Sequence, residues 1–175
     1  MGIDESGFIA LLMRQLDEAQ RVAAWILGDV VAAEDAVQES AARAWAARAS
    51  LRDPATMSAW FGRIVVNTCR DELRRRGRRP AIADLTLADP LPDTAIRDRI
   101  DERDEVARAL RHLSPDARVV LALRYGADLT VPAIAARLGI PDGTAKTRLR
   151  DALEAARRAL AAERDAAIRA EEARA

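Results

Sequence analysis

The spacing of apolar residues is the feature that most limits the folds open to this chain. Apolar side chains recur at intervals of three and four residues, and no stretch alternates apolar and polar residues as a half-buried strand does. Two clear stripes of this kind are Phe61, Val65, Cys69 and Leu73, and Ala145, Leu149, Ala152, Ala156 and Leu160. Each places one apolar face on a helix. The sequence therefore predicts an all-α fold.

The same periodicity predicts seven helices in two groups. The first group is expected near residues 5–27, 33–48 and 56–76, and the second near 94–112, 115–125, 131–138 and 142–162. Between them the chain carries three prolines and no helical stripe, which is typical of a linker. We therefore expect two small helical domains, 1–79 and 95–162, joined by a flexible linker at 80–94. A charged, alanine-rich tail would follow at 163–175.

Composition narrows the functional classes. Half of the 175 residues are hydrophobic, enough for a packed core, with Trp25 and Trp45 expected inside it and His112 on the surface. The chain lacks a signal-peptide pattern and a run of roughly 18 apolar residues, so a cytoplasmic protein is expected. One His and one Cys offer no catalytic or metal-binding constellation and no internal disulfide. We expect neither an enzyme nor a bound metal or cofactor.

Charge is balanced overall, at 28 basic and 28 acidic residues, but it is segregated along the chain. Residues 70–79, "RDELRRRGRR", are mostly arginine, and the helix expected from residue 142 is again basic. Basic islands of this kind are candidates for contact with nucleic acid.

The segment 129–150, "LTVPAIAARLGIPDGTAKTRLR", has the pattern of a helix-turn-helix. Thr130 can cap the first helix, Gly139 can end it in a left-handed conformation, and Pro141 prevents simple continuation. On the second helix, Thr147 and Arg150 lie opposite the apolar stripe, with further basic residues on its flanks. A plain helical hairpin with solvated arginines is the alternative. The donors near the helix start favour DNA binding.

Two other helices carry polar faces. Asn67, Arg70, Asp71 and Arg74 lie opposite the stripe of the third helix, where an amide and guanidinium groups can contact bases and phosphates. A solvated basic helix end is the alternative. On the second helix, Asp35, Gln38 and Glu39 point outward and suit a basic protein partner, unless this face is simply solvated.

Three segments carry a resemblance to a known family: "AEDAVQESAARAW", "MSAWFGRIVVNTCRDELRRRGRRP" and "LSPDARVVLALRYGADLTVPAIAARLGIPDGTAKTRLRDALEAARRAL". In order and spacing they resemble regions 2 and 4 of the extracytoplasmic-function group of bacterial sigma-70 factors. The resemblance implies a subunit without catalysis of its own that binds core RNA polymerase and directs promoter-specific transcription initiation. It also implies promoter DNA as a partner and an anti-sigma factor as a possible one.

The resemblance also implies roles for individual residues. The residues that match the polymerase-binding face are Asp35, Gln38 and Glu39. Those that match the surface for the minus-ten element, where a base is flipped from the duplex, are Trp60, Phe61, Asn67, Thr68, Arg70, Asp71 and Arg74. Those that match the recognition helix for the minus-thirty-five element are Thr144, Lys146, Thr147, Arg148 and Arg150.

Some positions depart from the family pattern. Ser40 replaces a large apolar residue, Ala133 follows an unusual Pro132 where a glutamate is common, and Asp151 replaces a basic residue. Two other classes remain as alternatives: a stand-alone helix-turn-helix regulator and a helical protein-interaction module. The regulator normally needs a dimer, for which no coiled-coil seam is evident. The interaction module has no use for two separated basic faces.

Overall fold

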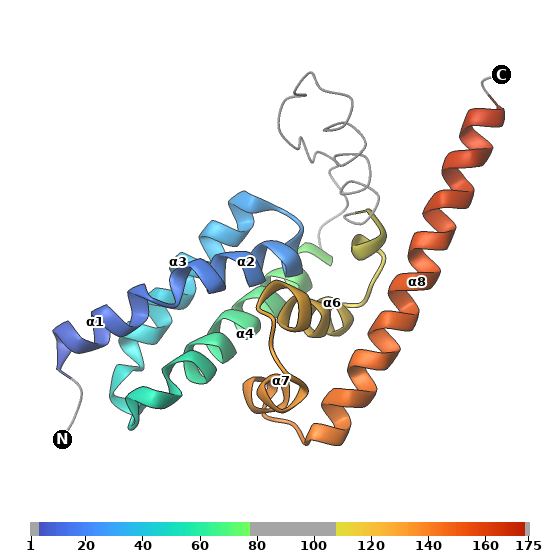
Figure 1. Cartoon of the computed structure of the whole chain (residues 1–175). Helices are drawn as coiled ribbons and strands as arrows, with labels where there is room; N and C mark the ends of the chain where they lie inside the picture. The colour runs from blue at the N-terminus through green and yellow to red at the C-terminus, as the bar shows by residue number, and fades with distance from the viewer. Residues whose placement is uncertain (1–3, 78–107, 174–175) are drawn as a thin grey trace.

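The computed structural model describes residues 4–77 and 108–173, which are helical and contain no strand (Figure 1). The first part holds α1 (Glu5–Met13), α2 (Leu16–Leu27), α3 (Val30–Ala46) and α4 (Met57–Gly77), with short 3₁₀ turns at Arg48–Ser50 and Pro54–Thr56. The second part holds α6 (Pro115–Leu121), a π-helical turn η3 (Ala122–Gly126), α7 (Val131–Leu138) and α8 (Asp142–Glu172). The predicted all-α class with two helical units is confirmed.

Local capping explains where several helices begin and end. The side chains of Asp29, Ser114 and Thr130 accept hydrogen bonds from backbone N–H groups in the first turns of α3, α6 and α7. Gly28 and Gly139 end α2 and α7 in the left-handed conformation, with φ of +65° and +66°. The predicted cap at Thr130 and stop at Gly139 are both confirmed.

Helices α2, α3 and α4 pack around one apolar core. Phe61, Val65 and Cys69 of α4 are almost completely buried, as the predicted stripe requires, and they meet Ile26 of α2 there. Phe8 of α1 closes the end of this core. Burial of each large side chain contributes about 1.5–3 kcal/mol to the free energy of folding.

The second helical unit shares this core. Val119 of α6, Leu123 of η3 and Ile134 of α7 are buried in the same cluster as the side chains of α2 and α4. Figure 1 shows α6 and α7 lying against α4, with α8 extending along the other side of α6. A smaller cluster, including Leu113 and Ala152, joins α6 to α8. The described residues therefore form one packed body.

Polar side chains connect the two units within this body. Arg137 of α7 is only 5% exposed, and its guanidinium donates to Glu18 Oε1 at 2.6 Å and to Ser58 Oγ at 2.7 Å. The guanidinium lies against Gly62, where an added Cβ would come within 2.5 Å of Arg137 Nε. Arg63 Nη2 donates to the carbonyl oxygen of Ala136 at 2.9 Å, near the end of α7.

Helix boundaries differ clearly from the sequence expectation at four places, one of which is the start of α3 at Val30, three residues before the expected 33. The single helix expected over 5–27 is interrupted after Met13 by a tight turn, in which Gln15 N–H donates to the Leu12 carbonyl. The helix expected to end at Tyr125 passes into the π-helical turn η3. The last helix continues from 162 to Glu172, because its alanines and long charged side chains favour helix and no Gly or Pro stops it.

The two tryptophans expected in the core are partly exposed, so that prediction is wrong. Trp25 is 39% exposed and lies against Gly126, whereas Trp45 is 36% exposed and packs edge-on against Phe8 at 6.0 Å. Each ring covers the rim of the core, where a large aromatic side chain can bury one face and leave its other edge in water. His112 is exposed, as expected.

The expected linker at 80–94, and most of the helix expected at 94–112, lie outside the described residues; 108–111 are helical. Within the described ranges, no helix is long and apolar enough to cross a membrane.

Candidate functional site

The outer face of α3 presents the predicted acidic and amide patch. Asp35 and Gln38 are exposed, and the side chain of Glu39 is 43% exposed. Ser40, a departure from the family pattern, is fully buried, and its hydroxyl donates to the carbonyl oxygen of Ala36 at 2.6 Å. The helix backbone thus satisfies the hydroxyl group that replaces a large apolar side chain.

Helix α4 separates a buried face from a polar one. Asn67 and Arg74 are exposed and Asp71 is partly exposed, on the side away from Val65 and Cys69. Burial raises the pKa of the Cys69 thiol to about 12, so this cysteine is a core residue without nucleophilic character. Asn67, Asp71 and Arg74 follow one another at helical spacings of four and three and form the exposed row of α4.

Three members of the predicted minus-ten set lie behind this row. Phe61 is 1% exposed and Thr68 is fully buried, while Trp60 is half-buried and packs edge-on against Phe8 at 6.2 Å. The Thr68 hydroxyl donates to the Ile64 carbonyl at 3.0 Å. In this arrangement Phe61 and Thr68 support α4 from inside and present no side chain to a ligand.

Arg70 departs from its expected outward position. Its side chain is 18% exposed and forms an ion pair with Asp116 of α6, with 2.9 Å between Nη2 and Oδ1. The helical wheel predicted an outward arginine, but α6 covers this part of α4. The Arg70 Nε is buried without a hydrogen-bond partner. Arg70 therefore links the two helical units in this structure.

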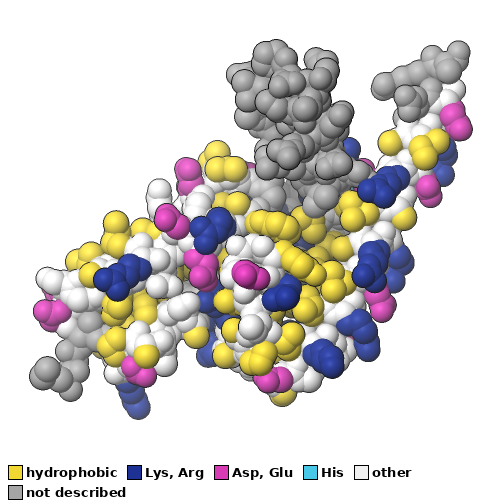
Figure 2. All heavy atoms as spheres, in the orientation of Figure 1, with side chains coloured by type: hydrophobic (Ala, Val, Ile, Leu, Met, Phe, Trp, Pro, Cys, Tyr) yellow, Lys and Arg dark blue, Asp and Glu magenta, His cyan; other side chains and the backbone are white. Residues whose placement is uncertain are grey.

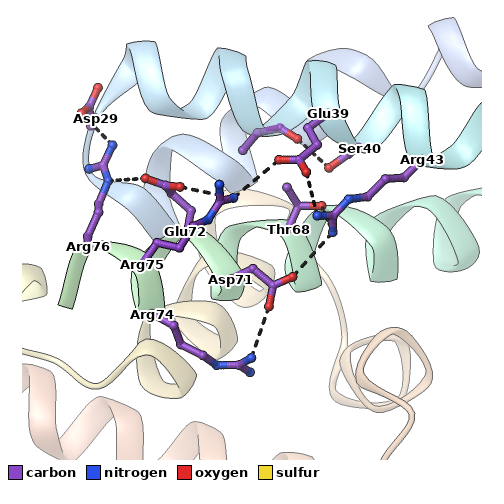
Figure 3. Close-up of polar contacts among 11 residues, drawn as sticks. Asp29, Glu39, Ser40, Arg43, Thr68, Asp71, Glu72, Arg74, Arg75 and Arg76 are labelled. Atoms are coloured by element: carbon purple, nitrogen blue, oxygen red, sulfur yellow. Dashed lines mark hydrogen bonds and ion pairs between the residues drawn. The ribbon is translucent and has the colours of Figure 1, made fainter. Parts of the chain in front are cut away.

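The three arginines in the last turns of α4, Arg74, Arg75 and Arg76, take part in a network of alternating charges (Figure 3). Arg74 pairs with Asp71 at 3.2 Å, and Arg75 lies 3.4 Å from Glu72 and 3.6 Å from Glu39. Arg43 of α3 joins this network, although sequence reasoning did not single it out; its spacing of four from Glu39 was the available signal. Because most of these groups are exposed, each pair adds only about 0–1 kcal/mol to stability.

The first turns of α8 present the predicted recognition face. Thr144, Lys146, Thr147 and Arg150 are exposed and Arg148 is half-buried, whereas Ala145 of the apolar stripe is 1% exposed. Figure 2 shows Lys and Arg side chains spaced along α8, at the right edge of this face.

Two departures from the family pattern also lie in the helix-turn-helix. Asp151 pairs with Arg150 at 2.9 Å and so offsets part of its charge. Pro132 and Ala133 occupy the first turn of α7, where proline is tolerated because its missing N–H needs no partner.

Sequence reasoning also missed Arg137. It lies three residues after the buried Ile134, on the packed side of α7, and this placement in an apolar stripe was the signal for a buried arginine. In the described residues no group of three or more His, Cys, Asp or Glu side chains could hold a metal ion.

Each of the two helical units matches the model of a known protein family. Residues 11–79 match the model for Sigma-70 region 2, and residues 103–155 match the model for Sigma-70, region 4. The chain is 33% identical over 157 residues to the ECF RNA polymerase sigma factor SigL of Mycobacterium tuberculosis, covering 85% of this chain and 88% of SigL. It is 34% identical over 135 residues to the probable RNA polymerase sigma factor RfaY of Xanthomonas campestris pv. campestris. That match covers 73% of this chain and 34% of RfaY.

Solved structures share the fold. CnrH in complex with the cytosolic domain of CnrY superposes with a TM-score of 0.61 at 27% identity, covering 93% of this chain and 90% of that one. The sigma factor RpoE, in complex with the anti-sigma factor NepR from Bartonella quintana, superposes with a TM-score of 0.65 at 24% identity. The latter match covers 87% of this chain and 96% of RpoE.

Proposed function

The chain belongs to the extracytoplasmic-function group of sigma-70 RNA polymerase sigma factors, and from this membership we propose how its exposed residues act in promoter-specific transcription initiation. The observation that carries the function is the presence of region 2 and region 4 in order, each on its own helical unit. A stand-alone helix-turn-helix regulator would have no use for region 2. We further propose that the protein works in the cytoplasm and performs no catalysis itself.

The exposed face of α3 is the proposed contact with core polymerase. Asp35, Gln38 and Glu39 offer two carboxylates and an amide on consecutive turns of one helix. Such a face complements a basic surface and would speed and orient association more than it adds to affinity.

The exposed row of α4 is the proposed reader of the minus-ten element. Asn67 can donate to and accept from a base edge, while Arg74 can hold a neighbouring phosphate. Flipping a base costs a few kcal/mol of unstacking, so rigid backing is needed, and buried Phe61 and Thr68 supply it.

The start of α8 is the proposed reader of the minus-thirty-five element in the major groove. Thr144, Lys146, Thr147, Arg148 and Arg150 lie in the first turns of a helix that begins just after the Gly139 turn. Recognition helices contact base edges with this part of the helix.

The packed body must open for both elements to be read at once. The positions that name the two elements are about 25 base pairs apart, which is roughly 85 Å of duplex at about 3.4 Å per pair. Helix α4, with 21 residues, is only about 32 Å long and packs directly on α7. We therefore propose that core polymerase holds the two units apart. An anti-sigma partner would act by preventing the two units from binding core polymerase.

Reconstitution with bacterial core RNA polymerase tests the function. The purified chain should bind the core enzyme and direct run-off transcription from a subset of a promoter-fragment library. A folded chain that binds naked duplex but not core polymerase would instead favour the stand-alone regulator.

An Asn67→Ala variant tests the minus-ten assignment. Loss of the amide should lower promoter use, because no base-edge contact remains at that position, while affinity for core polymerase stays close to the wild type. Equal loss of core binding and promoter use would contradict the assignment. Binding to labelled core enzyme and run-off transcription measure the two effects separately.

An Arg148→Ala variant tests the upstream contact. Binding at the minus-thirty-five element should weaken by roughly 1–3 kcal/mol if Arg148 contacts a base. The measurement is competition between promoters that differ only in the upstream element. An unchanged preference among them would argue against the contact.

A further inference from the structure

Arg43 connects the polymerase-facing side of α3 with the exposed row of α4 (Figure 3). Its Nη2 donates to Glu39 Oε1 at 2.7 Å. Its Nη1 donates to Thr68 Oγ1 at 3.3 Å and lies 3.6 Å from Asp71 Oδ2. One guanidinium thus contacts three side chains, two of which belong to α4.

The contact with Thr68 fixes the guanidinium against α4. Thr68 is fully buried, and its hydroxyl hydrogen is already donated to the Ile64 carbonyl. The hydroxyl oxygen therefore accepts from Arg43 with its remaining capacity. Because a buried threonine has little freedom to move, this hydrogen bond holds the Arg43 guanidinium at a fixed position on α4.

The contact with Asp71 extends the effect of Arg43 to the outer surface. One carboxylate oxygen of Asp71 faces Arg43, and the other lies 3.2 Å from Arg74 Nη1. Asn67 is one helical turn before Asp71 on the same face. Glu39, Arg43, Asp71 and Arg74 form a row of alternating charges, in which Asp71 lies between Asn67 and Arg74 on the exposed row of α4.

We propose that Arg43 is a positioning residue for recognition of the minus-ten element, an inference that rests on the proposed function. Arg43 holds Asp71 in place and offsets its negative charge, and Asp71, which lies between Asn67 and Arg74 on the exposed row of α4, in turn holds Arg74. Without Arg43, the Asp71 carboxylate would be freer to move and would repel nearby phosphates. Discrimination between minus-ten sequences then depends on a residue that itself need not touch DNA.

The test compares Arg43→Gln with the wild type, each reconstituted with bacterial core RNA polymerase, on a promoter library randomised in the minus-ten element. Transcription from mismatched minus-ten sequences, relative to the best one, should rise about threefold to tenfold in the variant. The affinity for core polymerase and the preference among minus-thirty-five sequences should not change. Arg43→Lys, which keeps a cation beside Asp71, should restore most of the discrimination.

Arg48→Gln is the matched control. Arg48 lies in the 3₁₀ turn that follows α3, the helix of Arg43. Its side chain is 40% exposed, against 42% for that of Arg43, and it forms an ion pair with Glu5 at 3.2 Å. It makes no contact with α4 among the described ion pairs and hydrogen bonds. The control loses the same charge, so it should keep the wild-type minus-ten profile.

A double-mutant cycle with Asp71→Asn decides whether Arg43 acts through Asp71. The double variant should discriminate no worse than Asp71→Asn alone, because the intermediary is already lost. Three results would each overturn the inference. The effects of the two substitutions on minus-ten discrimination could be fully additive, or the Arg43→Gln profile could equal that of Arg48→Gln. Arg43→Gln could also lose affinity for core polymerase to the same extent as it loses discrimination. If the wild type initiated at no promoter, the proposed function would fall and this inference with it.

Discussion

At the residue scale, Asp29 joins two helices through one carboxylate. It caps α3 by accepting from Ala32 N–H, and its other oxygen lies 3.2 Å from Arg76 at the end of α4. The backbone hydrogen bond and the Arg76 guanidinium lower the pKa of Asp29, outweighing the opposing effect of burial. Burial also opposes charge on Arg76, but its hydrogen bonds to Glu72 and Asp29 raise its pKa.

Replacement of Asp29 tests this double role. At pH 7, Asp29→Ala should lower the free energy of unfolding by about 1 kcal/mol, the usual cost of a lost N-cap. Because folding lowers the pKa of Asp29, its contribution is present above the ordinary value of 3.8 and is lost as the pH falls through the folded-state value. Urea unfolding at pH 7 and in the acid range should show the difference from wild type shrinking at low pH.

The control for this prediction is Asp35→Ala, which removes an exposed carboxylate from the same helix. Its unfolding free energy should stay within about 0.5 kcal/mol of wild type. A loss equal to that of Asp29→Ala would mean that helix charge, and not capping, explains the effect.

At the element scale, the helix-turn-helix depends on a glycine that the sequence already marks. Gly139 has φ of +66°, and the backbone N–H groups of Gly139 and Ile140 donate to carbonyls at the end of α7. Arg63 of α4 donates to the Ala136 carbonyl there as well. The turn that sets the direction of α8 is thus fixed by the local backbone conformation and by the hydrogen bond from Arg63 of the first helical unit.

Gly139→Ala should destabilise the protein by about 1–2 kcal/mol, because a Cβ in the left-handed region meets the backbone carbonyl. Chemical denaturation measures the change. Gly143→Ala is the matched control: it lies in the first turn of α8, and no atom is within 4 Å of an added Cβ. That variant should gain about 0.5–1 kcal/mol from helix propensity. Equal effects of the two substitutions would exclude conformational strain at Gly139.

At the scale of the whole molecule, Arg137 holds the two helical units together. It is the buried end of an ion pair whose partner, Glu18, lies 119 residues away in sequence. Burying a charge is costly unless it is paired and hydrogen-bonded, and Glu18 and Ser58 satisfy this condition. Opening of the body would return Arg137 to water and break both contacts.

Arg137→Ala should therefore lower the free energy of unfolding by about 2 kcal/mol and loosen the packing of the units. Denaturation and small-angle scattering measure the two effects, and the radius of gyration should increase. Arg157→Ala, at an exposed position of α8, removes the same charge and should change neither quantity. An unchanged radius for Arg137→Ala would mean that the apolar core alone keeps the body closed.

Much of the candidate site could be predicted from local patterns. Asn67, Asp35 and Thr147 are exposed as the helical periodicity predicted, because a stripe of buried residues fixes the outward direction of a helix within a turn. The assignment of these residues to partners stays a prediction. The same reasoning failed at Arg70 and Trp25, where a second element decides how much of the surface remains open.

The sequence by itself determined the helical class, the cap at Thr130, the stop at Gly139 and the family, since helical periodicity and capping act within a few residues of chain. Only the tertiary structure decided that region 4 packs on region 2, that Arg137 meets Glu18, and that Arg70 meets Asp116. Arg43 meets Asp71 across two helices for the same reason. These contacts depend on how separate elements pack, and neither charge nor spacing along one chain specifies which distant partner a side chain will reach.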